Sequence, residues 1–395
     1  MTDAPVKLPL IYRLSRITWP WFTCTMSTGA IAALLSQQPF PFRGLVAIGT
    51  MFFIFDAVLF FIFNLMMFIR ITRNPRAWLA SLHHPNESFF FGAYWVSVAL
   101  IIYSIQAYGV PRSGPWLIRA LEVLFWVYIS CSLCVAIFQY QAIFSVERLL
   151  IADAMPAWIL PAYPSLVTGP LAGVLLKSQP VESGQRILIA GIAIQGLGWT
   201  IAFIIYTMYL TRLTTHKMPA HGMRPGMYVA VGPAAYTSAG LISLGRASPG
   251  LFPTLNLSSA SPTPIPVGSV MAVLGFVSGI FLFLVAFWFC ALATITVLRV
   301  VRRMSWTLNW WAFIFPNVGL AIACIQIGDA LGSKGVQGVG AGLTLLLIVM
   351  WIFVMGASLR ALWKGQVLSP NNDPGLDDVE LVLGDAITTG RNRIY

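Results

Sequence analysis

Charged residues are scarce in this sequence. Asp, Glu, Lys and Arg make up 9% of the 395 residues, whereas soluble domains carry roughly 25%. Hydrophobic residues make up 58%, and the mean hydropathy is +0.79. These values exclude a soluble globular enzyme. Because a bilayer core takes about 20 apolar residues per helical span, the chain has room for about ten spans joined by short loops.

Groups suited to catalysis and metal binding are also few. The four histidines lie outside the apolar runs, and HExxH, GxSxG and phosphate-loop patterns are absent. The five cysteines lie inside apolar stretches, and their odd number argues against a disulfide framework. Cys131 and Cys134 form a CxxC pair without a second pair, so we interpret them as small hydrophobic residues. We expect no cofactor and no metal, and a membrane-embedded enzyme or receptor is only the third hypothesis.

Ten apolar segments are separated by charge, glycine and proline. They predict an all-α integral membrane protein, with a ten-helix transmembrane domain over residues 17–363. Numbered one to ten in chain order, the predicted spans are 19–37, 44–69, 88–109, 116–145, 156–176, 187–210, 225–245, 267–298, 309–328 and 338–362.

Lys and Arg are unevenly divided between the two sides of this arrangement. With both termini in the cytoplasm, that side holds 17 of the 24 Lys and Arg residues and the other side holds seven, in line with the positive-inside rule. Topology thus explains the net charge of +11, and nucleic acid is excluded as a partner. We expect a cytoplasmic segment over 1–16, without signal-peptide features, and a disordered acidic cytoplasmic tail over 364–395.

A glycosylation sequon, Asn256-Leu257-Ser258, lies in the Ser- and Pro-rich loop before the eighth span. The charge-based orientation places this loop outside the cell, so Asn256 is the expected glycosylation site. A second sequon, at Asn86, falls on the cytoplasmic side, where no glycan is expected.

Odd-numbered and even-numbered spans differ in composition. Even spans such as 44–69 and 267–298 are rich in Phe, Leu, Ile and Val, as lipid-facing helices should be, whereas odd spans carry Ser, Thr, Gly and Pro. We infer an inner ring of odd helices inside an outer ring of even helices. The alternative is that small residues only permit close helix packing.

Three odd spans carry a proline about two turns from their cytoplasmic start. These are Pro164, Pro233 and Pro316. A proline there breaks or kinks the helix and suits the first turn of a new half-helix. Helix N-termini carry partial positive charge and free N–H groups. Several of them at one depth would bind an anion, which favours an anion transport pathway along the inner ring.

Five long stretches of the odd spans and their approaches carry recognisable motifs. They are PWFTCTMSTGAIAALL from Pro20, HHPNESFFFGAYWVSVALII from His83, PAWILPAYPSLVTGPLAG from Pro156, RPGMYVAVGPAAYTSAGLISLG from Arg224 and WWAFIFPNVGLAIA from Trp310. Together they resemble the tellurite-resistance/dicarboxylate transporter family, and within it the fungal malate permeases. Fungal sulfite efflux pumps share the fold and a related His-Pro motif, but Glu87 and the Tyr94-Trp95 pair look more like the malate branch.

The resemblance implies ten helices arranged as five helical hairpins around a central pore, with the odd helices inside. It also implies a homo-oligomer, a trimer as in bacterial and plant relatives, with a dimer as the alternative. In those relatives a phenylalanine before the proline of the ninth helix obstructs the pore, and the matching residue here is Phe315. The alternative for Phe315 is an ordinary packed aromatic side chain.

A dicarboxylate needs two positive charges or equivalent dipoles. Arg224, before the seventh span, and Arg76, between the second and third, are the best-placed arginines, although each also fits a plain positive-inside anchor. Polar groups of the odd spans complete the predicted substrate site. These residues are Thr25, Ser27, Thr28, Ser165, Thr168, Thr237, Ser238 and Asn317.

Titratable groups at the mouth of the third span are candidates for proton coupling. Glu87 lies there with His83 and His84. Histidine titrates near neutral pH, and removal from water raises the pKa of a carboxyl group. A helix-capping or loop-bonding role is the alternative, and a protonated substrate monoanion would need no protein carboxyl. Asp56 and Glu122 lie within even spans, where we expect them to pair with neighbouring helices.

The leading hypothesis is a proton-linked plasma-membrane transporter of C4-dicarboxylates, with malate as substrate and succinate and fumarate as further candidates. The rival hypothesis is a sulfite or small-anion exporter or channel on the same fold. The sequence leaves open both alternating access and a gated channel.

Overall fold

The computed structural model describes residues 14–84, 87–146, 149–252 and 266–364. Within these ranges the regular elements are all helical, as predicted, and no strand occurs. Nine helical segments of this part of the chain are long and apolar enough to cross a membrane. The predictions for most of the N-terminal segment, for the sequon at Asn256 and for the tail beyond residue 364 lie outside the described residues.

The five even-numbered spans form long helices. Their outward faces carry large apolar side chains such as Phe61, Phe281 and Leu345, which are 70%, 69% and 68% exposed, as lipid contact requires. The helices are α3 (Leu45–Arg73), α6 (Pro115–Cys134) continued by η5 (Val135–Gln139) and α7 (Tyr140–Val146), α10 (Val181–Thr215), α12 (Val267–Leu298) and α14 (Lys334–Trp363).

In the connections between spans lie three short helices, α4 (Pro75–Ser81), η6 (Ile151–Asp153) and η9 (Val301–Arg303).

Each odd-numbered span begins with a 3-10 segment that passes into an α-helix. The odd spans are η1 (Trp19–Trp21) with α2 (Phe22–Leu35), η2 (Ser88–Phe90) with α5 (Phe91–Ser104), η3 (Ile105–Gly109) and η4 (Val110–Arg112), η7 (Pro156–Ala162) with α8 (Tyr163–Leu166) and α9 (Thr168–Leu175), η8 (His221–Ala230) with α11 (Val231–Leu251), and η10 (Leu308–Phe313) with α13 (Phe315–Ala330).

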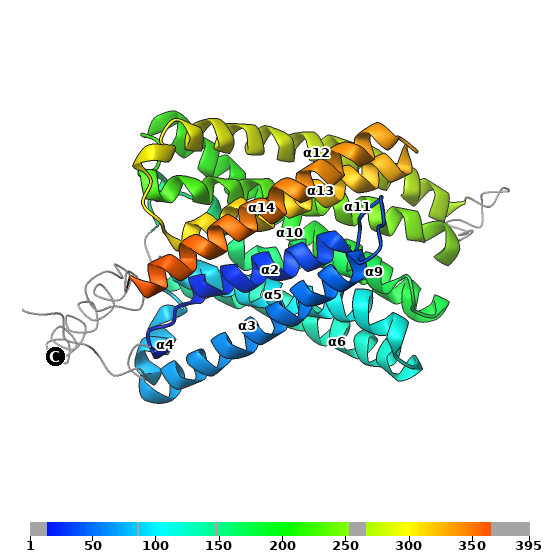
Figure 1. Ribbon diagram of the computed structural model, residues 1–395, viewed down its shortest axis with the longest axis horizontal. Helices are drawn as coiled ribbons and strands as arrows, with labels where there is room; N and C mark the ends of the chain where they lie inside the picture. Colours follow the sequence, from blue (N-terminus) through cyan, green and yellow to red (C-terminus); the bar gives the residue numbers. More distant parts are fainter. Residues whose placement is uncertain (1–13, 85–86, 147–148, 253–265, 365–395) are drawn as a thin grey trace, which may run out of the picture.

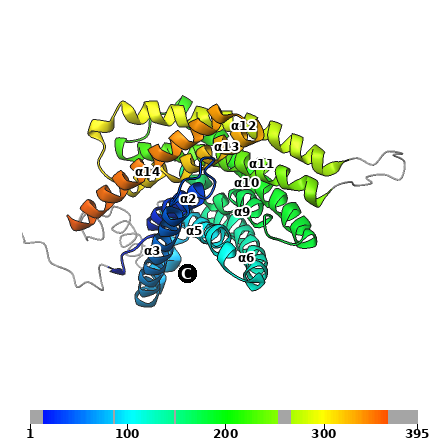
Figure 2. The same ribbon diagram turned by 45° about the vertical axis from the view of Figure 1, so that its right-hand side comes forward.

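Burial alternates along the chain as the composition predicts. The buried share of the most apolar stretch is 61–94% in the spans of α5, α9, α11 and α13, and 17–39% in the even-numbered spans. Every residue of α2 is also buried. Helix α12 lies along one side of the molecule and α3 and α6 along the opposite side (Figure 1), and the turned view shows α3 and α6 extending outward from α2 and α5 (Figure 2). The prediction of buried odd helices and exposed even helices is confirmed.

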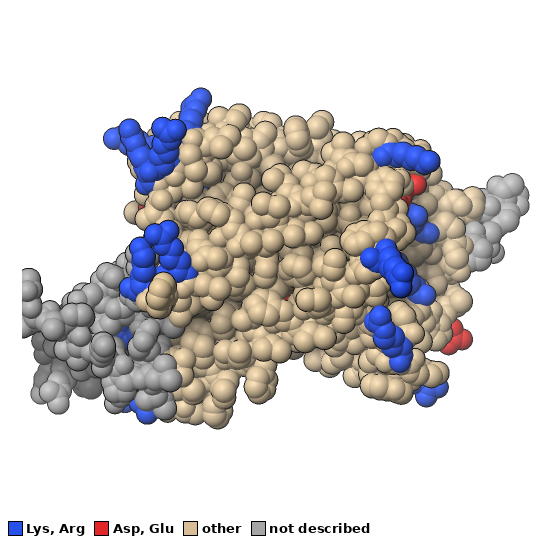
Figure 3. Space-filling view, in the orientation of Figure 1, with Lys and Arg blue, Asp and Glu red and all other residues tan. Residues whose placement is uncertain are grey.

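Charged side chains avoid the middle of the molecule. On the face shown in Figure 3, Lys and Arg gather at the two ends of the long axis, and the surface between them carries neither acid nor base. An uncharged belt flanked by basic residues is typical of a protein that spans a bilayer.

Glycine lets two inner helices approach each other closely. Gly92 of α5 lies against the backbone of η7, and a Cβ atom at this position would be 1.8 Å from the carbonyl oxygen of Leu160. Packed backbone has little room to move aside. Close packing therefore accounts for part of the small-residue content of the odd spans.

We expect Gly92→Ala to lower the free energy of unfolding by about 3 kcal/mol, because the new methyl group overpacks against fixed backbone. Thermal unfolding of the purified protein in detergent measures the effect. Gly342→Ala on α14 is the matched control, since a Cβ atom there meets no atom within 4 Å. Equal unfolding temperatures for the two variants would contradict the close contact.

Candidate anion pathway

Two tyrosine side chains from different inner helices pack against the ring of Phe315. The Phe315 ring, at the first residue of α13, is fully buried and stacks on Tyr236 of α11, with ring centroids 4.7 Å apart and planes at 23°. Tyr163 of α8 lies on it at 5.7 Å and 49°. The Tyr236 hydroxyl donates to the Phe315 carbonyl at 2.8 Å, and the Tyr163 hydroxyl donates to the carbonyl of Val229. This aromatic cluster (Tyr163, Tyr236 and Phe315) is therefore held by both ring contacts and hydrogen bonds.

A small apolar cavity adjoins the aromatic cluster. Side chains from all five odd-numbered spans line it, for example Ala33, Ala99, Leu171, Tyr236 and Ile322. The cavity volume is about 20 Å³, which is room for about one water molecule. Ordinary ligand pockets have at least roughly 300 Å³. The inner helices are closed to a dicarboxylate at this level in this conformation.

The three prolines lie where the sequence analysis placed them, at the start of α-helices. Pro164 is the second residue of α8, Pro233 the third of α11 and Pro316 the second of α13. One N–H group at each junction, that of Tyr163, Val231 or Ile314, donates to a carbonyl of the preceding 3-10 segment. The N–H of Ile314, for example, donates to Trp311 at 3.1 Å. These three N–H groups are therefore not free to bind an anion, whereas the prediction for the other N–H groups in the first turns of the α-helices stays a prediction.

The predicted hydroxyl ligands are all buried and all form hydrogen bonds within the protein. Ser27, Ser165 and Ser238 tie their helices to neighbours, through the Trp311 carbonyl at 3.1 Å, the Ser132 hydroxyl at 2.9 Å and the Gly279 carbonyl at 2.7 Å. The threonines donate to a carbonyl one turn earlier in their own span, and these are Thr25, Thr28, Thr168 and Thr237. Since a hydroxyl has only one proton to donate, an anion would have to compete with these bonds.

The remaining predicted ligands lie in different surroundings. Asn317 donates its amide to the Phe313 carbonyl at 3.0 Å, and its Oδ1 atom is buried without a partner in the described part of the chain. Arg224 is half-buried and donates to the carbonyls of Pro219 at 3.0 Å and Thr296 at 3.5 Å, contacts that suit an anchor. Arg76 is exposed on α4.

Glu87 forms a buried ion pair with Arg70 of α3. Both side chains are almost fully buried, and the two guanidinium nitrogens donate to the two carboxylate oxygens, Nη2 to Oε2 at 3.0 Å. The backbone N–H of Trp19 also donates to Oε1 at 3.2 Å. Glu87 thereby connects η1 and α3 to the start of the third span. These are the contacts expected if Glu87 has a loop-bonding role. His83 and His84 are half-buried on the connection before it.

The two acids within even-numbered spans have different environments. Glu122 of α6 pairs with Arg186 of α10 at 3.6 Å, as expected of a neighbouring-helix contact. Asp56 of α3 faces inward, is 1% exposed, and neither of its oxygens has a hydrogen-bond partner among the described residues. Its Oδ2 atom lies 2.6 Å from the position that a Cβ atom at Gly29 would take. Asp56 therefore contacts the neighbouring helix α2 at Gly29, as expected, but it forms no ion pair among the described residues.

Long apolar outer helices around buried inner helices that begin with prolines are the features of a multi-span membrane protein. The family model described as the voltage-dependent anion channel (SLAC1) matches residues 16–359, so the chain belongs to this family. The chain is 31% identical to the malic acid transport protein of Schizosaccharomyces pombe over 372 residues, 93% of this chain and 83% of the relative. It is 27% identical to the sulfite efflux pump SSU1 of Trichophyton rubrum over 343 residues, 86% of this chain and 89% of the relative. These findings confirm the resemblance drawn from the motifs.

Proposed function

We propose that the protein is a proton-linked transporter of C4-dicarboxylates, malate above all, in the plasma membrane. The observation that carries the proposal is the similarity to the malic acid transport protein over 93% of the chain. Succinate and fumarate share the two carboxylates of malate and are further candidate substrates. Export or channel-like conduction of sulfite is the second candidate function, because the sulfite efflux pump is similar over 86% of the chain.

We further propose that Trp19–Leu35 is a tenth span and that the ten spans form five hairpins around a central pore. Two observations support this arrangement. Each inner helix contacts the outer helix that follows it, as the pairs α2 and α3, α5 and α6, α9 and α10, α11 and α12, and α13 and α14. Side chains from all five inner helices also meet at one cavity. Cytoplasmic termini and assembly into a homo-oligomer, a trimer by resemblance, belong to the same proposal.

In this proposal Phe315 is the gate, and the helix dipoles and inner-span hydroxyls stabilise the carboxylates once the pathway opens. Arg224 and Arg76 raise the local concentration of anions at the cytoplasmic mouth. The unpaired Oδ1 of Asn317 is an acceptor, so it suits the hydroxyl of malate better than a carboxylate. Glu87, His83 and His84 stay candidates for proton coupling, and Asp56 joins them because its buried carboxyl has no partner among the described residues.

Transport by purified protein in liposomes tests the proposal. With the outside acidic by one pH unit, we expect labelled malate to accumulate inside by up to about tenfold for each coupled proton. Collapsing the pH gradient with an ionophore should abolish the accumulation, and protein-free liposomes are the control. Voltage-driven sulfite flux without malate uptake would support the second candidate, and an absence of flux for malate, sulfite and nitrate would refute both.

A further inference from the structure

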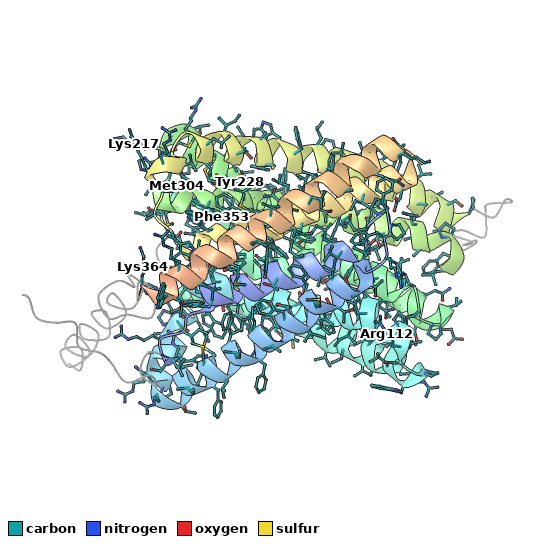
Figure 4. All side chains as sticks on the ribbon, viewed as in Figure 1. Arg112, Lys217, Tyr228, Met304, Phe353 and Lys364 are labelled. Atoms are coloured by element: carbon teal, nitrogen blue, oxygen red, sulfur yellow. The ribbon has the colours of Figure 1, made fainter. Side chains whose placement is uncertain are left out.

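An open groove lies at one end of the molecule, between α14 and the segment that leads into η10. Its volume is about 540 Å³, which is within the roughly 300–1,000 Å³ of ligand sites. One wall is the last three turns of α14, and the other carries the indole rings of Trp306 and Trp310. Figure 4 shows Phe353 of this wall nearer the middle of the molecule and Lys364 at its end. The groove therefore runs from the end of the molecule toward its apolar belt.

The groove changes from charged to apolar along its length. Arg360 and Lys364 line its outer end, one helical turn apart on the same face of α14. Neither has an acidic partner within the residues that the structure describes. Further in, Phe353 stacks on Trp310 with ring centroids 5.8 Å apart and planes at 23°, and Ile352 continues the apolar wall. Among the described residues, the groove thus has two cations without an acidic partner at one end and an apolar surface at the other. This arrangement matches a phosphate group joined to an acyl chain.

Two further features of the groove indicate an occupant. The indole N–H of Trp306 is buried and has no acceptor within the described ranges, although a tryptophan N–H ordinarily finds one when buried. Phosphate and ester oxygens are such acceptors. At Gly356, which forms part of the floor, a Cβ atom would meet nothing within 4 Å. The trough is thus hollow because α14 lacks a side chain there.

We propose that this groove binds one acidic phospholipid of the adjacent leaflet. The phosphate lies against Arg360 and Lys364, an ester or phosphate oxygen accepts from Trp306, and an acyl chain lies over Gly356 along Ile352 and Phe353. The inference needs only that the chain spans a membrane, so it does not depend on the transported anion. It concerns a binding site separate from the cavity between the inner helices.

Lipid titration of the full-length protein in neutral detergent, followed by native mass spectrometry, tests the proposal. We expect phosphatidylglycerol to bind with one tight site per chain, at least about tenfold more tightly than phosphatidylcholine. The double variant Arg360→Gln/Lys364→Gln should weaken phosphatidylglycerol binding by about 30-fold, because each cation near an acidic lipid contributes about a factor of five. The matched control is Arg302→Gln/Arg303→Gln, which removes two exposed cations of η9 outside the groove.

A second variant tests the apolar trough without touching charge. Gly356→Leu should fill the groove and weaken lipid binding at least about tenfold while the protein keeps its unfolding temperature, because the helix has open space there. Gly342→Leu, at an equally open position on the same helix, should leave binding unchanged. Loss of binding in Gly356→Leu but not in Gly342→Leu distinguishes a filled groove from a general effect on α14.

Four outcomes would overturn the proposal. Equal affinity for phosphatidylcholine, or binding unchanged by both groove variants, would show that the lipid does not occupy this groove. Inorganic phosphate that binds with the same dependence on Arg360 and Lys364, without phosphatidylglycerol binding, would show a site for soluble anions. Phosphatidylglycerol binding only after Asp377→Asn/Asp378→Asn would show that the acidic C-terminal segment is the occupant instead.

Discussion

Replacing Phe315 by alanine should raise malate flux by about 30-fold. In the proposed gate, an anion passes only when the ring leaves its contacts with Tyr163 and Tyr236. Each aromatic pair contributes about 1 kcal/mol, and 1.4 kcal/mol corresponds to a factor of ten in rate, so removal of the ring lowers the barrier by about 2 kcal/mol. Flux into liposomes, divided by the amount of folded protein in them, measures the effect.

Phe313→Ala is the matched control for the gate variant. Phe313 lies two residues earlier and contacts Tyr228 and Trp310, so the same atoms are deleted outside the aromatic cluster. We expect its flux to stay within about twofold of the unmodified protein, since those contacts do not close the cavity between the inner helices. If Phe315→Ala raised neither the current nor the leak, Phe315 would be a packed aromatic residue and not a gate.

The second large effect is expected for Glu87→Gln, which should lower the free energy of unfolding by about 3–5 kcal/mol. The change leaves the Arg70 guanidinium buried without its carboxylate. Thermal unfolding of the purified protein measures the loss. Because replacing both members of a buried ion pair by apolar residues is often neutral, the double variant Arg70→Met/Glu87→Met should recover most of the stability.

Asp56→Asn provides the comparison for Glu87→Gln. It makes the same change from acid to amide at a buried carboxyl, but no ionic partner is left behind in the described structure. We therefore expect Asp56→Asn to keep its unfolding temperature. If Glu87→Gln kept full stability and lost only the pH dependence of uptake, Glu87 would be a proton-coupling group and the ion pair would be dispensable.

Much of the fold could be predicted from the sequence because composition and lipid exposure are directly linked. Helices that face lipid need bulky apolar residues on most of their surface, which is why 44–69 and 267–298 were recognisable. Helices surrounded by other helices tolerate Ser, Thr and Gly, which is why the inner spans stood out. The ends of the spans were less predictable. Helix α10 runs from Val181 to Thr215 and not from 187 to 210, since charged residues at the ends of a helix do not interrupt it.

The candidate site was only partly predictable, because its contacts join residues far apart in the chain. Proline placement is local chemistry, and Pro233 and Pro316 were correctly assigned to helix starts. The ion pair of Arg70 and Glu87 depends on how the connection between two spans folds back, and Arg70 looked like any other basic residue at a span end. A glutamate directly before an apolar span was the available signal. Similarly, nothing local indicated that Tyr236 would stack on Phe315.

The 3-10 segments at the start of the inner helices give the inner layer two halves of different stiffness. The hydrogen bonds within a 3-10 segment have poorer geometry than those of an α-helix, so the 3-10 half rearranges more easily than the α-helical half. A 3-10 helix rises about 2.0 Å per residue, whereas an α-helix rises about 1.5 Å. The ten-residue segment His221–Ala230 is therefore about 5 Å longer than the same residues would be in an α-helix. Rewinding it would draw Arg224 toward the aromatic cluster while α11 stayed in place. Because only the residues from Arg224 to Ala230 lie between Arg224 and α11, this shift of Arg224 would be about 3 Å, close to the length of one hydrogen bond.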